Sequence, residues 1–311
     1  MPGLGTHKRK YVLSGFLIAL TGALLFSTKA VIVKHAFMHT TIDAVSLLAL
    51  RMIFALPFYI GIAIFAERKS TAIQFSRKQW LYVILLGLSG YYLSSLWDFV
   101  GLQYISAGLE RLILFLYPTF TVLFNAFIFK QKINSFQKWA LLLTYSGIAI
   151  AYWGELHFVQ SSTGLIKGSI YIFLCAITFA IYIVGSGRLI PQVGATKFTA
   201  YAMIASTVGV ITHYAVQGIE KSHFTPQLLT YGIILGFFAT VIPSFFISNG
   251  IKRIGANNVA ILSSVGPVST IIQAHFILGE DIFIEQIVGT VLVIIGVILI
   301  GWKNTTSPAG E

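Results

Sequence analysis

The chain has few charged residues, fewer acids than bases, and almost no cysteine. Only 10% of its 311 residues are charged, whereas 56% are hydrophobic, and ten acids stand against 21 lysines and arginines. An average soluble domain is about 25% charged, so this composition excludes a water-soluble globule. The single cysteine, Cys175, excludes both an intrachain disulfide and a cysteine cluster with metal-ligand spacing.

The sequence also lacks the short motifs of common enzymes. It has no Walker loop and no His-Glu-x-x-His pair. Gly185-Ser186-Gly187 is interpreted as a turn at a helix end, and Ser263-Ser264 has no nearby histidine or lysine to activate a nucleophile. We therefore predict that the protein is not an enzyme and needs no metal, nucleotide or prosthetic group.

Long apolar runs, in contrast, recur along the whole chain. Each is long enough to cross about 30 Å of hydrocarbon. Because no water is available there, the backbone N–H and C=O groups must bond within their own segment, so such runs form helices. The sequence predicts an all-α integral membrane protein with ten transmembrane helices, at residues 11–34, 42–65, 80–100, 106–129, 136–153, 164–185, 197–217, 227–249, 256–278 and 282–302.

Lysine and arginine are distributed unevenly between the predicted loops. With a cytoplasmic N-terminus, fifteen of them fall on the inner side and only Lys34, Lys167 and Lys221 on the outer side. This asymmetry follows the positive-inside rule. We predict a multi-pass protein of the cell's inner (plasma) membrane with both termini in the cytoplasm. The net charge of +11 is then topological, and the dispersed cations form no nucleic-acid-binding motif.

The second half of the chain repeats the first half. Gly101–Trp153 aligns without a gap with Gly250–Trp302, an offset of 149 residues that superposes Pro118 on Pro267. Because each half has five helices, the second must be inverted in the membrane, an arrangement that supports alternating access. The predicted organisation is a first repeat at 1–153, a connecting loop at 154–163, an inverted second repeat at 164–302 and a disordered cytoplasmic tail at 303–311.

Six stretches carry a resemblance to a known family. They are Phe26–Lys34, Leu48–Arg51, Ala55–Pro57, Asp98–Arg111, Tyr117–Pro118 and, in the second copy, Ala256–Glu280. Together they resemble EamA-type members of the drug/metabolite transporter superfamily. The resemblance implies two inverted repeats of five helices, with helices 1–4 and 6–9 around a central cavity and helices 5 and 10 at the periphery. It also implies export or exchange of small metabolites, often amino acids, in an inner membrane.

The sequence departs from this family at two places. Lys130–Lys132 stands where the second copy has Gly279–Asp281, the acidic form associated with the family, and Phe26 replaces a tryptophan often found there. Multidrug members of the superfamily, which export organic cations, resemble one another in carrying an acid in the first helix. This chain has Lys29 in that helix.

Two prolines occupy matching places in the predicted fourth and ninth helices. Pro118 and Pro267 each remove one helical hydrogen bond and free a carbonyl, which membrane depth tolerates only against protein or a wet cavity. We predict that both breaks border a substrate cavity; kinks that serve packing alone are the alternative. The neighbouring polar residues that are candidate cavity lining are Tyr117, Thr121, Ser263, Ser264 and Thr270.

Five ionisable residues in the first four predicted spans are candidates for an intramembrane role. A Lys or Arg at the centre of a transmembrane helix costs about 2.5–3.5 kcal/mol, so its presence indicates a function or a partner. Lys29 and Arg51 lie deepest and are candidate substrate ligands. The alternatives are snorkelling of Lys29 and pairing of Arg51 with Asp98 or Glu110. Asp98, Glu110 and Arg111 lie nearer helix ends and are candidates for an ion pair or gate.

The sign of these charges bears on the substrate. Three cations against two acids leave one cation in surplus, which favours a carboxylate or another anion in a low-dielectric cavity. We predict a secondary active or facilitative carrier of small carboxylate-bearing metabolites, amino acids in particular, with a carrier for cationic drugs as one alternative. Candidate aromatic walls, each of which could equally serve packing, are Phe26, Tyr91, Tyr92, Trp97, Phe115 and Tyr117.

Coupling and partners are open from the sequence. His213 and His275, toward the outer ends of helices 7 and 9, are candidate proton-coupling residues, with hydrogen-bonded interfacial histidines as the alternative. A non-transporting membrane scaffold or assembly subunit is a further alternative; it requires neutralised charges and closed space between the halves. The expected partners are the lipid bilayer, a small-molecule metabolite and, through Gly289 and Gly296, a second copy in a homodimer.

Overall fold

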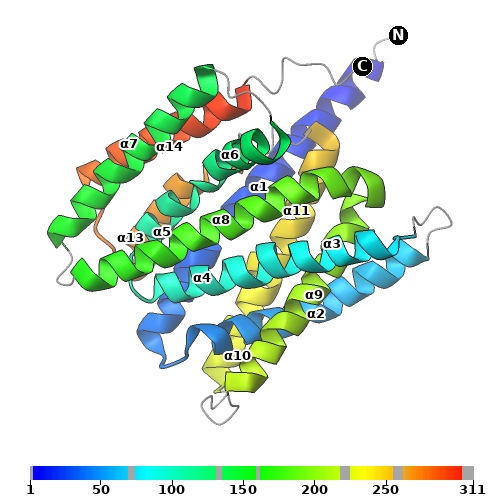
Figure 1. Cartoon of the computed structure of the whole chain (residues 1–311), viewed down its shortest axis with the longest axis horizontal. Coiled ribbons are helices and arrows are strands. Elements are labelled where there is room, and N and C mark those ends of the chain that lie inside the picture. Colours follow the sequence, from blue (N-terminus) through cyan, green and yellow to red (C-terminus); the bar gives the residue numbers. More distant parts are fainter. Residues whose placement is uncertain are drawn as a thin grey trace.

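The computed structural model describes residues 3–68, 74–130, 135–158, 162–217, 225–254, 262–263 and 265–302. Every regular element in these ranges is helical, as Figure 1 shows. In chain order the elements, with η marking π-helical segments, are α1 (Gly3–His39), α2 (Ala44–Glu67), α3 (Arg77–Gly87), η1 (Leu88–Leu93), α4 (Ser94–Leu102), α5 (Ala107–Leu114), α6 (Tyr117–Phe129), α7 (Ser135–Phe158), α8 (Ser162–Val193), α9 (Ala195–Gln217), α10 (Pro226–Ile233), η3 (Ile234–Val241), α11 (Ile242–Ile254), α13 (Gly266–Leu278) and α14 (Ile284–Trp302).

The helices have the length and composition expected of a membrane protein. Within the described ranges, seven helical stretches are long and apolar enough to cross a bilayer, and they cover predicted spans one to four and six to eight. The 24-residue α7 covers the fifth span, while α13 and α14 are shorter apolar helices over the last two. The all-α membrane architecture is confirmed. The total of ten spans stays a prediction, since residues 256–261 lie outside the described ranges.

Polar residues determine where several helices begin. The Asp43 carboxylate accepts hydrogen bonds from two amides of the first turn of α2, and the hydroxyls of Ser106 and Thr225 cap α5 and α10. Ser76 and Gln79 form a reciprocal capping box at the start of α3. These side chains satisfy amide groups that have no partner within the helix, so they fix the helix starts near the membrane surfaces.

The backbone repeats at the offset found in the sequence. Tyr117–Phe129 forms α6 and Gly266–Leu278, 149 residues later, forms α13. The residues that end these two helices, Lys130 and Gly279, are both left-handed, with φ of 54° and 70°. The π-helical segments η1 and η3 also overlap at this offset. The two halves therefore share local structure as well as sequence, while their inverted orientation in the membrane stays a prediction.

Long helices pack pairwise between the two halves. α1 packs on α11, α8 on α4, and α2 on α9, while α7 and α14 lie side by side along one edge of the molecule (Figure 1). A Cβ atom added at Gly289 would meet the carbonyl oxygen of Gly147, and one at Gly296 would meet Thr144. These glycines therefore bring α14 close to α7 of the same chain. The prediction that they face a second copy is wrong, because this surface is already covered; a homodimer itself stays a prediction.

Candidate functional site

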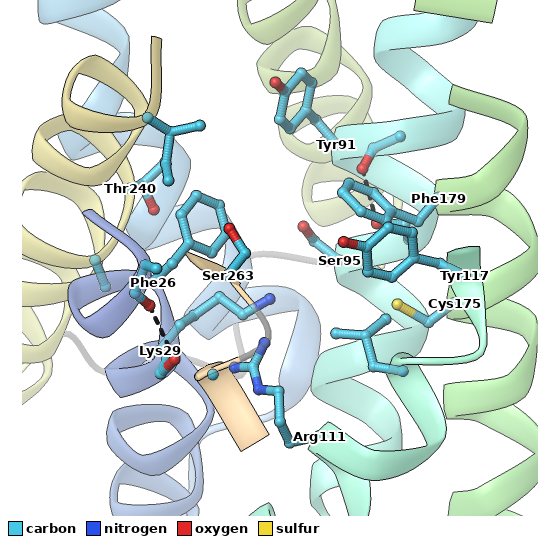
Figure 2. Close-up of a pocket in the computed structure, with 18 of the residues that line it drawn as sticks. Phe26, Lys29, Tyr91, Ser95, Arg111, Tyr117, Cys175, Phe179, Thr240 and Ser263 are labelled. Atoms are coloured by element: carbon cyan, nitrogen blue, oxygen red, sulfur yellow. Dashed lines mark hydrogen bonds between the residues drawn. The ribbon is translucent and has the colours of Figure 1, made fainter. Parts of the chain in front are cut away.

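A cavity of about 240 Å³ lies at the centre of the molecule (Figure 2). Its walls come from α1, α2, η1, α4, α5, α6, α8, η3 and α11, together with Ser263 and Gly266. Among the described residues, α7 and α14 contribute nothing to its lining. The cavity is therefore surrounded by helices of both halves, and the edge pair α7 and α14 supports the bundle from outside.

Much of the lining consists of residues that correspond between the two halves. Twelve of the 21 lining residues form six pairs separated by the repeat offset of 149. The pairs are Phe26 and Cys175, Gly90 and Ala239, Tyr91 and Thr240, Ser95 and Ser244, Leu114 and Ser263, and Tyr117 and Gly266. The cavity thus lies where the two copies of the repeat meet.

Local departures from α-helical geometry place these residues. Gly90 and Tyr91 lie in η1, and Ala239 and Thr240 lie in η3. The Thr240 hydroxyl donates to the carbonyl of Leu235, five residues back, as a π-turn allows (2.8 Å). A Cβ atom at Gly90 would collide with the Tyr182 ring, so glycine is required for the close approach of α8. π-Helical turns within α-helices often occur at functional sites.

The two prolines break the chain more completely than a kink would. We expected Pro118 and Pro267 inside continuous helices, but each lies in the first turn of a new helix, α6 and α13 respectively. A first-turn proline sacrifices no helical hydrogen bond, because its N–H would lack a partner there anyway. The prolines do not line the cavity. The residues just before them, Leu114 and Ser263 among others, do line it.

Two acid–base pairs are buried beside the cavity. Lys29 Nζ lies 2.7 Å from Asp98 Oδ2, and Arg111 Nε lies 3.7 Å from Glu110 Oε2. All four residues are at most 9% exposed. Figure 2 shows Lys29 from α1 and Arg111 from α5 reaching into the same space. Asp98, Glu110 and Arg111 are therefore placed as ion-pair partners, and Lys29 is a partner as well as a lining residue.

Arg51 is the cation that these pairs leave over. It lines the cavity and is 3% exposed. Its Nη2 donates to Ser95 Oγ (3.2 Å), and its guanidinium lies 5.4 Å from the centre of the Phe99 ring. Its Nε and Nη1 have no hydrogen-bond acceptor among the described residues. The alternative in which Arg51 pairs with Asp98 or Glu110 is not seen, because those carboxylates face Lys29 and Arg111.

The predicted aromatic and hydroxyl lining is only partly assembled. Tyr91 and Tyr117 line the cavity; the Tyr91 hydroxyl lies 2.8 Å from the hydroxyl of Tyr182, and Tyr117 meets Phe179 edge-on. Ser263 also lines it, as do Phe26 and Phe115. Ser264 lies outside the described residues.

Three candidates lie elsewhere. Trp97 stacks on Tyr171, with 5.7 Å between the ring centres. The Thr121 hydroxyl donates to the carbonyl of Tyr117 (2.8 Å), and that of the fully buried Thr270 donates to the carbonyl of Ser27 (3.3 Å). Both threonine hydroxyls thus have backbone partners. None of the three residues lines the cavity.

Sequence reasoning missed several lining residues. Ser95, Ser244 and Thr240 present hydroxyl groups, and Cys175 and Phe179 complete the wall formed by α8. Ser95 and Ser244 are identical at the repeat offset, so extending the alignment toward the N-terminus would have marked them. No pattern in the sequence marked Phe179.

The two histidines lie away from the cavity. His213 Nδ1 lies 2.9 Å from the hydroxyl of Tyr92, which is also outside the cavity lining, and His275 Nδ1 lies 2.9 Å from the carbonyl oxygen of Glu280. His275 is exposed. Both rings are thus held by neighbouring groups near helix ends, which matches the interfacial alternative.

Comparison with known proteins bears directly on this arrangement. The model of the EamA-like transporter family matches the chain twice, over residues 13–153 and 166–302. The chain belongs to the EamA-like transporter family. An EamA-like chain is a membrane-embedded transporter, and the two matches fall on the two halves that share helix boundaries.

Individual relatives agree with this assignment. The chain is 30% identical over 285 residues to the uncharacterized transporter YcbK of Bacillus subtilis, covering 89% of each chain. It is 23% identical over 293 residues to the uncharacterized inner membrane transporter YicL of Salmonella typhimurium, covering 92% of this chain and 94% of the other. A solved crystal structure with 16% identity matches with a TM-score of 0.65 over 96% of this chain and 99% of the other, which supports the fold.

Proposed function

We propose that this EamA-like protein is a carrier of small carboxylate-bearing metabolites, amino acids in particular, that works by alternating access. The single observation that carries the substrate class is Arg51, a buried cavity cation with two unpartnered guanidinium nitrogens and no ion-pair partner among the described residues. Arg111 also has two unpartnered nitrogens, but it lies beside Glu110. The mechanism is supported by the corresponding residues that line the cavity from both halves.

Burial makes the balance of charges around the cavity important for substrate choice. Lys29 and Asp98 offset one another, as do Arg111 and Glu110, so Arg51 contributes the net positive charge of the cavity. An unpaired charge in a low-dielectric interior is costly. A substrate carboxylate relieves that cost, because guanidinium N–H groups match its two oxygens in a planar, bidentate geometry. An organic cation would be repelled, which disfavours the cationic-drug alternative.

The size and polarity of the cavity narrow the substrate class. Its volume of about 240 Å³ lies below the roughly 300–1,000 Å³ of pockets for drug-sized ligands, so it suits a small metabolite. The hydroxyls of Ser95, Ser244 and Thr240 are potential acceptors for an ammonium group, and Phe26 and Phe179 provide apolar walls. An amino acid, with one carboxylate and one ammonium, uses both kinds of group.

Helix packing supports alternating access between two inverted repeats. The first helix of each repeat packs on the third helical stretch of the other, α1 on α11 and α8 on α4. Such reciprocal contacts are typical of a two-fold relation. When two inverted halves exchange conformations, a cavity on their shared axis opens to the opposite membrane face.

The membrane setting is part of the proposal. We place the protein in the inner membrane with both termini in the cytoplasm, on the basis of the basic loops. Neither His213 nor His275 lines the cavity, so uniport or exchange along the substrate gradient is the simplest mechanism. Proton antiport through these histidines predicts that an imposed pH gradient changes the rate.

The proposal is tested by efflux from liposomes. Purified protein is reconstituted in liposomes loaded with amino acids, organic acids and organic cations, and the released compounds are identified by mass spectrometry. Arg51→Gln removes the proposed ligand, and Arg77→Gln, at the exposed start of α3, is the matched charge control. Selective release of carboxylates that is lost only in Arg51→Gln supports the proposal.

The other outcomes are equally informative. Release of organic cations would retain the carrier and overturn the substrate class. Absence of any flux, with or without a pH gradient, would favour the scaffold alternative. That alternative requires neutralised charges and closed space between the halves, whereas the described residues surround a cavity and include no acid partner for Arg51.

A further inference from the structure

A second cavity, of about 650 Å³, lies between α3, α6 and α8, away from the central one. Its lining shares no residue with the central cavity. It lies at the ends of these helices that the charge distribution assigns to the cytoplasmic side. None of the proposed transport steps uses this groove, so a ligand bound there would be different from the transported substrate.

The groove has the depth of one membrane leaflet. On α8 its lining extends from Ile181 to Gln192, which lie eleven positions or about 16 Å of helix apart. Half of a hydrocarbon core of about 30 Å is about 15 Å. The groove thus extends from the level of the lipid headgroups to about the middle of the bilayer.

Below its rim, the groove is apolar and open to its surroundings. Tyr82 from α3 and Ile128 from α6 lie near the rim and Ile181 from α8 lies deeper; they line the groove and are 56%, 61% and 44% exposed. In a membrane-spanning chain, exposed apolar side chains at this depth face lipid chains. The shape and the apolar lining therefore fit an acyl chain.

The shallow end of the groove is polar and positively charged. Lys78 and Arg188 line it together with Gln79 and Gln192, whose amide groups are joined by a hydrogen bond of 3.3 Å between α3 and α8. The guanidinium of Arg188 lies over the ring of Phe129, 3.0 Å from its centre, which holds it at the rim. The described lining contains no acidic residue, so this end attracts an anion.

We propose that this groove binds an anionic phospholipid of the cytoplasmic leaflet. The phosphate lies between Lys78 and Arg188, amide groups of the two glutamines donate to the headgroup, and one acyl chain lies along Tyr82, Ile128 and Ile181. Basic pockets between transmembrane helices on this side bind acidic headgroups in this way. The site connects α3 to α8, and α8 also lines the central cavity, so the bound lipid holds the cytoplasmic ends of these two helices together.

The test measures lipid retention. Detergent-purified protein is incubated with mixed micelles containing phosphatidylglycerol or phosphatidylcholine with identical acyl chains, and retained lipid is counted by native mass spectrometry. We expect preferential retention of phosphatidylglycerol. The double variant Lys78→Gln/Arg188→Gln should weaken that retention about 30-fold, since each cation near the surface contributes about fivefold.

The matched control is Arg77→Gln/Lys138→Gln, which removes the same charge from exposed positions outside the groove. It should retain phosphatidylglycerol like the parent protein. Because Lys78 and Arg188 are exposed, both double variants should fold, and their unfolding temperatures confirm this. Equal loss of retention in both double variants would overturn the site.

Two further arms distinguish lipid from a free anion and separate the acyl-chain contact. Glycerophosphoglycerol, which has the same phosphodiester headgroup without acyl chains, should not displace the lipid at equal concentration; full displacement would overturn the lipid assignment. Ile181→Trp fills the apolar end and should weaken retention while both cations remain. Unchanged retention in that variant would show that the chain does not lie in the groove.

Discussion

At the scale of single residues, the site is decided by which charges have partners. Lys29 and Arg51 both line the cavity, and both are buried. Lys29 lies 2.7 Å from Asp98, whereas Arg51 has only a hydroxyl partner among the described residues. The two cavity cations therefore differ in their partners: Lys29 has an acid beside it, and Arg51 has none among the described residues, as the proposed ligand role requires.

Arg51 should be sensitive to geometry as well as charge. Arg51→Gln should lower kcat/KM for a carboxylate substrate about ten- to hundredfold, the effect of losing a charge-assisted hydrogen bond of about 1.5–3 kcal/mol. Arg51→Lys keeps the charge but loses the planar fork, so it should give an intermediate value. Initial rates of uptake into liposomes measure both. Equal rates for all three proteins would contradict a role for Arg51 in substrate binding.

The pair of Lys29 with Asp98 should be structural. Lys29→Met leaves Asp98 as an unpaired charge with 0% exposure, so it should cost about 3–5 kcal/mol of unfolding free energy. Lys29→Met/Asp98→Leu removes both charges and should recover most of that loss. Unfolding of the purified variants in mixed detergent measures this. A double variant as unstable as the single one would show that the pair does more than neutralise itself.

Glu280, in the loop between α13 and α14, should make stability depend on pH. Its carboxylate accepts hydrogen bonds from the amides of Ala107 (2.9 Å) and Gly108 (3.3 Å), but burial outweighs these bonds and Lys34, and it raises the pKa of Glu280 above its ordinary 4.5. The folded chain thus keeps this proton at pH values where the unfolded chain has lost it. Stability from this group is full below pH 4.5 and declines as pH rises through the raised pKa.

Glu280→Gln removes that titration. We expect its curve of unfolding temperature against pH, from 4 to 8, to be flatter than that of the parent protein. Asp281→Asn, one residue away, is the matched control and should leave the shape of the curve unchanged. A parent curve identical in shape to that of Glu280→Gln would refute the assignment.

At the scale of secondary-structure elements, irregular geometry builds the cavity and regular packing supports it. The π-helical segments η1 and η3 and the turns before α6 and α13 carry much of the lining. The regular pair α7 and α14 lies outside and is held by close glycine contacts. Irregular backbone at membrane depth is tolerated where protein or a cavity covers it, so these departures coincide with the site.

The contact between α7 and α14 should be intolerant of side chains. Gly289→Val places atoms against the carbonyl oxygen of Gly147, so the helices must separate, at a cost of about 1–3 kcal/mol from overpacking. Gly61→Val, where a Cβ atom would meet nothing within 4 Å, is the control. Thermal unfolding in detergent measures both variants. Equal stability of the two would mean that α14 can shift without loss.

At the scale of the whole molecule, the cavity lies between two copies of one structural unit. Paired residues from both copies line it, and the first helix of each copy packs on the other copy. The alternating access that we propose requires two related conformations of similar energy, and two copies of one unit around a shared cavity are suited to it.

Cys175 offers a test that needs no engineered cysteine. It is the sole cysteine of the chain, lines the cavity and is 2% exposed in this conformation. If the cavity opens alternately, a membrane-impermeant thiol reagent should label Cys175 from either side, and saturating substrate should slow labelling about tenfold or more. Cys175→Ser is the control for specificity, and mass spectrometry of the intact protein measures the labelled fraction. Labelling from one side alone would contradict alternating access.

Residues with a local signal were placed well from the sequence. Tyr91, Tyr117 and Ser263 line the cavity as predicted, and Lys29 and Arg51 face it. Trp97 and Thr121 satisfied the same criteria of residue type and depth, yet they contact protein instead. A difference of one or two positions on a helix turns a side chain by about 100° or 200°, and the predicted helix boundaries were not accurate enough to resolve it.

By itself, the sequence determined that the protein is an all-helical membrane transporter of two related halves. Hydrophobic runs and self-similarity are properties of the chain read in order, and a bilayer leaves such runs no alternative to a helix. Only the tertiary structure decided which cation has an acid partner. Lys29 meets Asp98, and Arg51 has no acid partner among the described residues, because of the way α1, α2 and α4 pack together. Such contacts between distant segments leave no pattern in a single sequence.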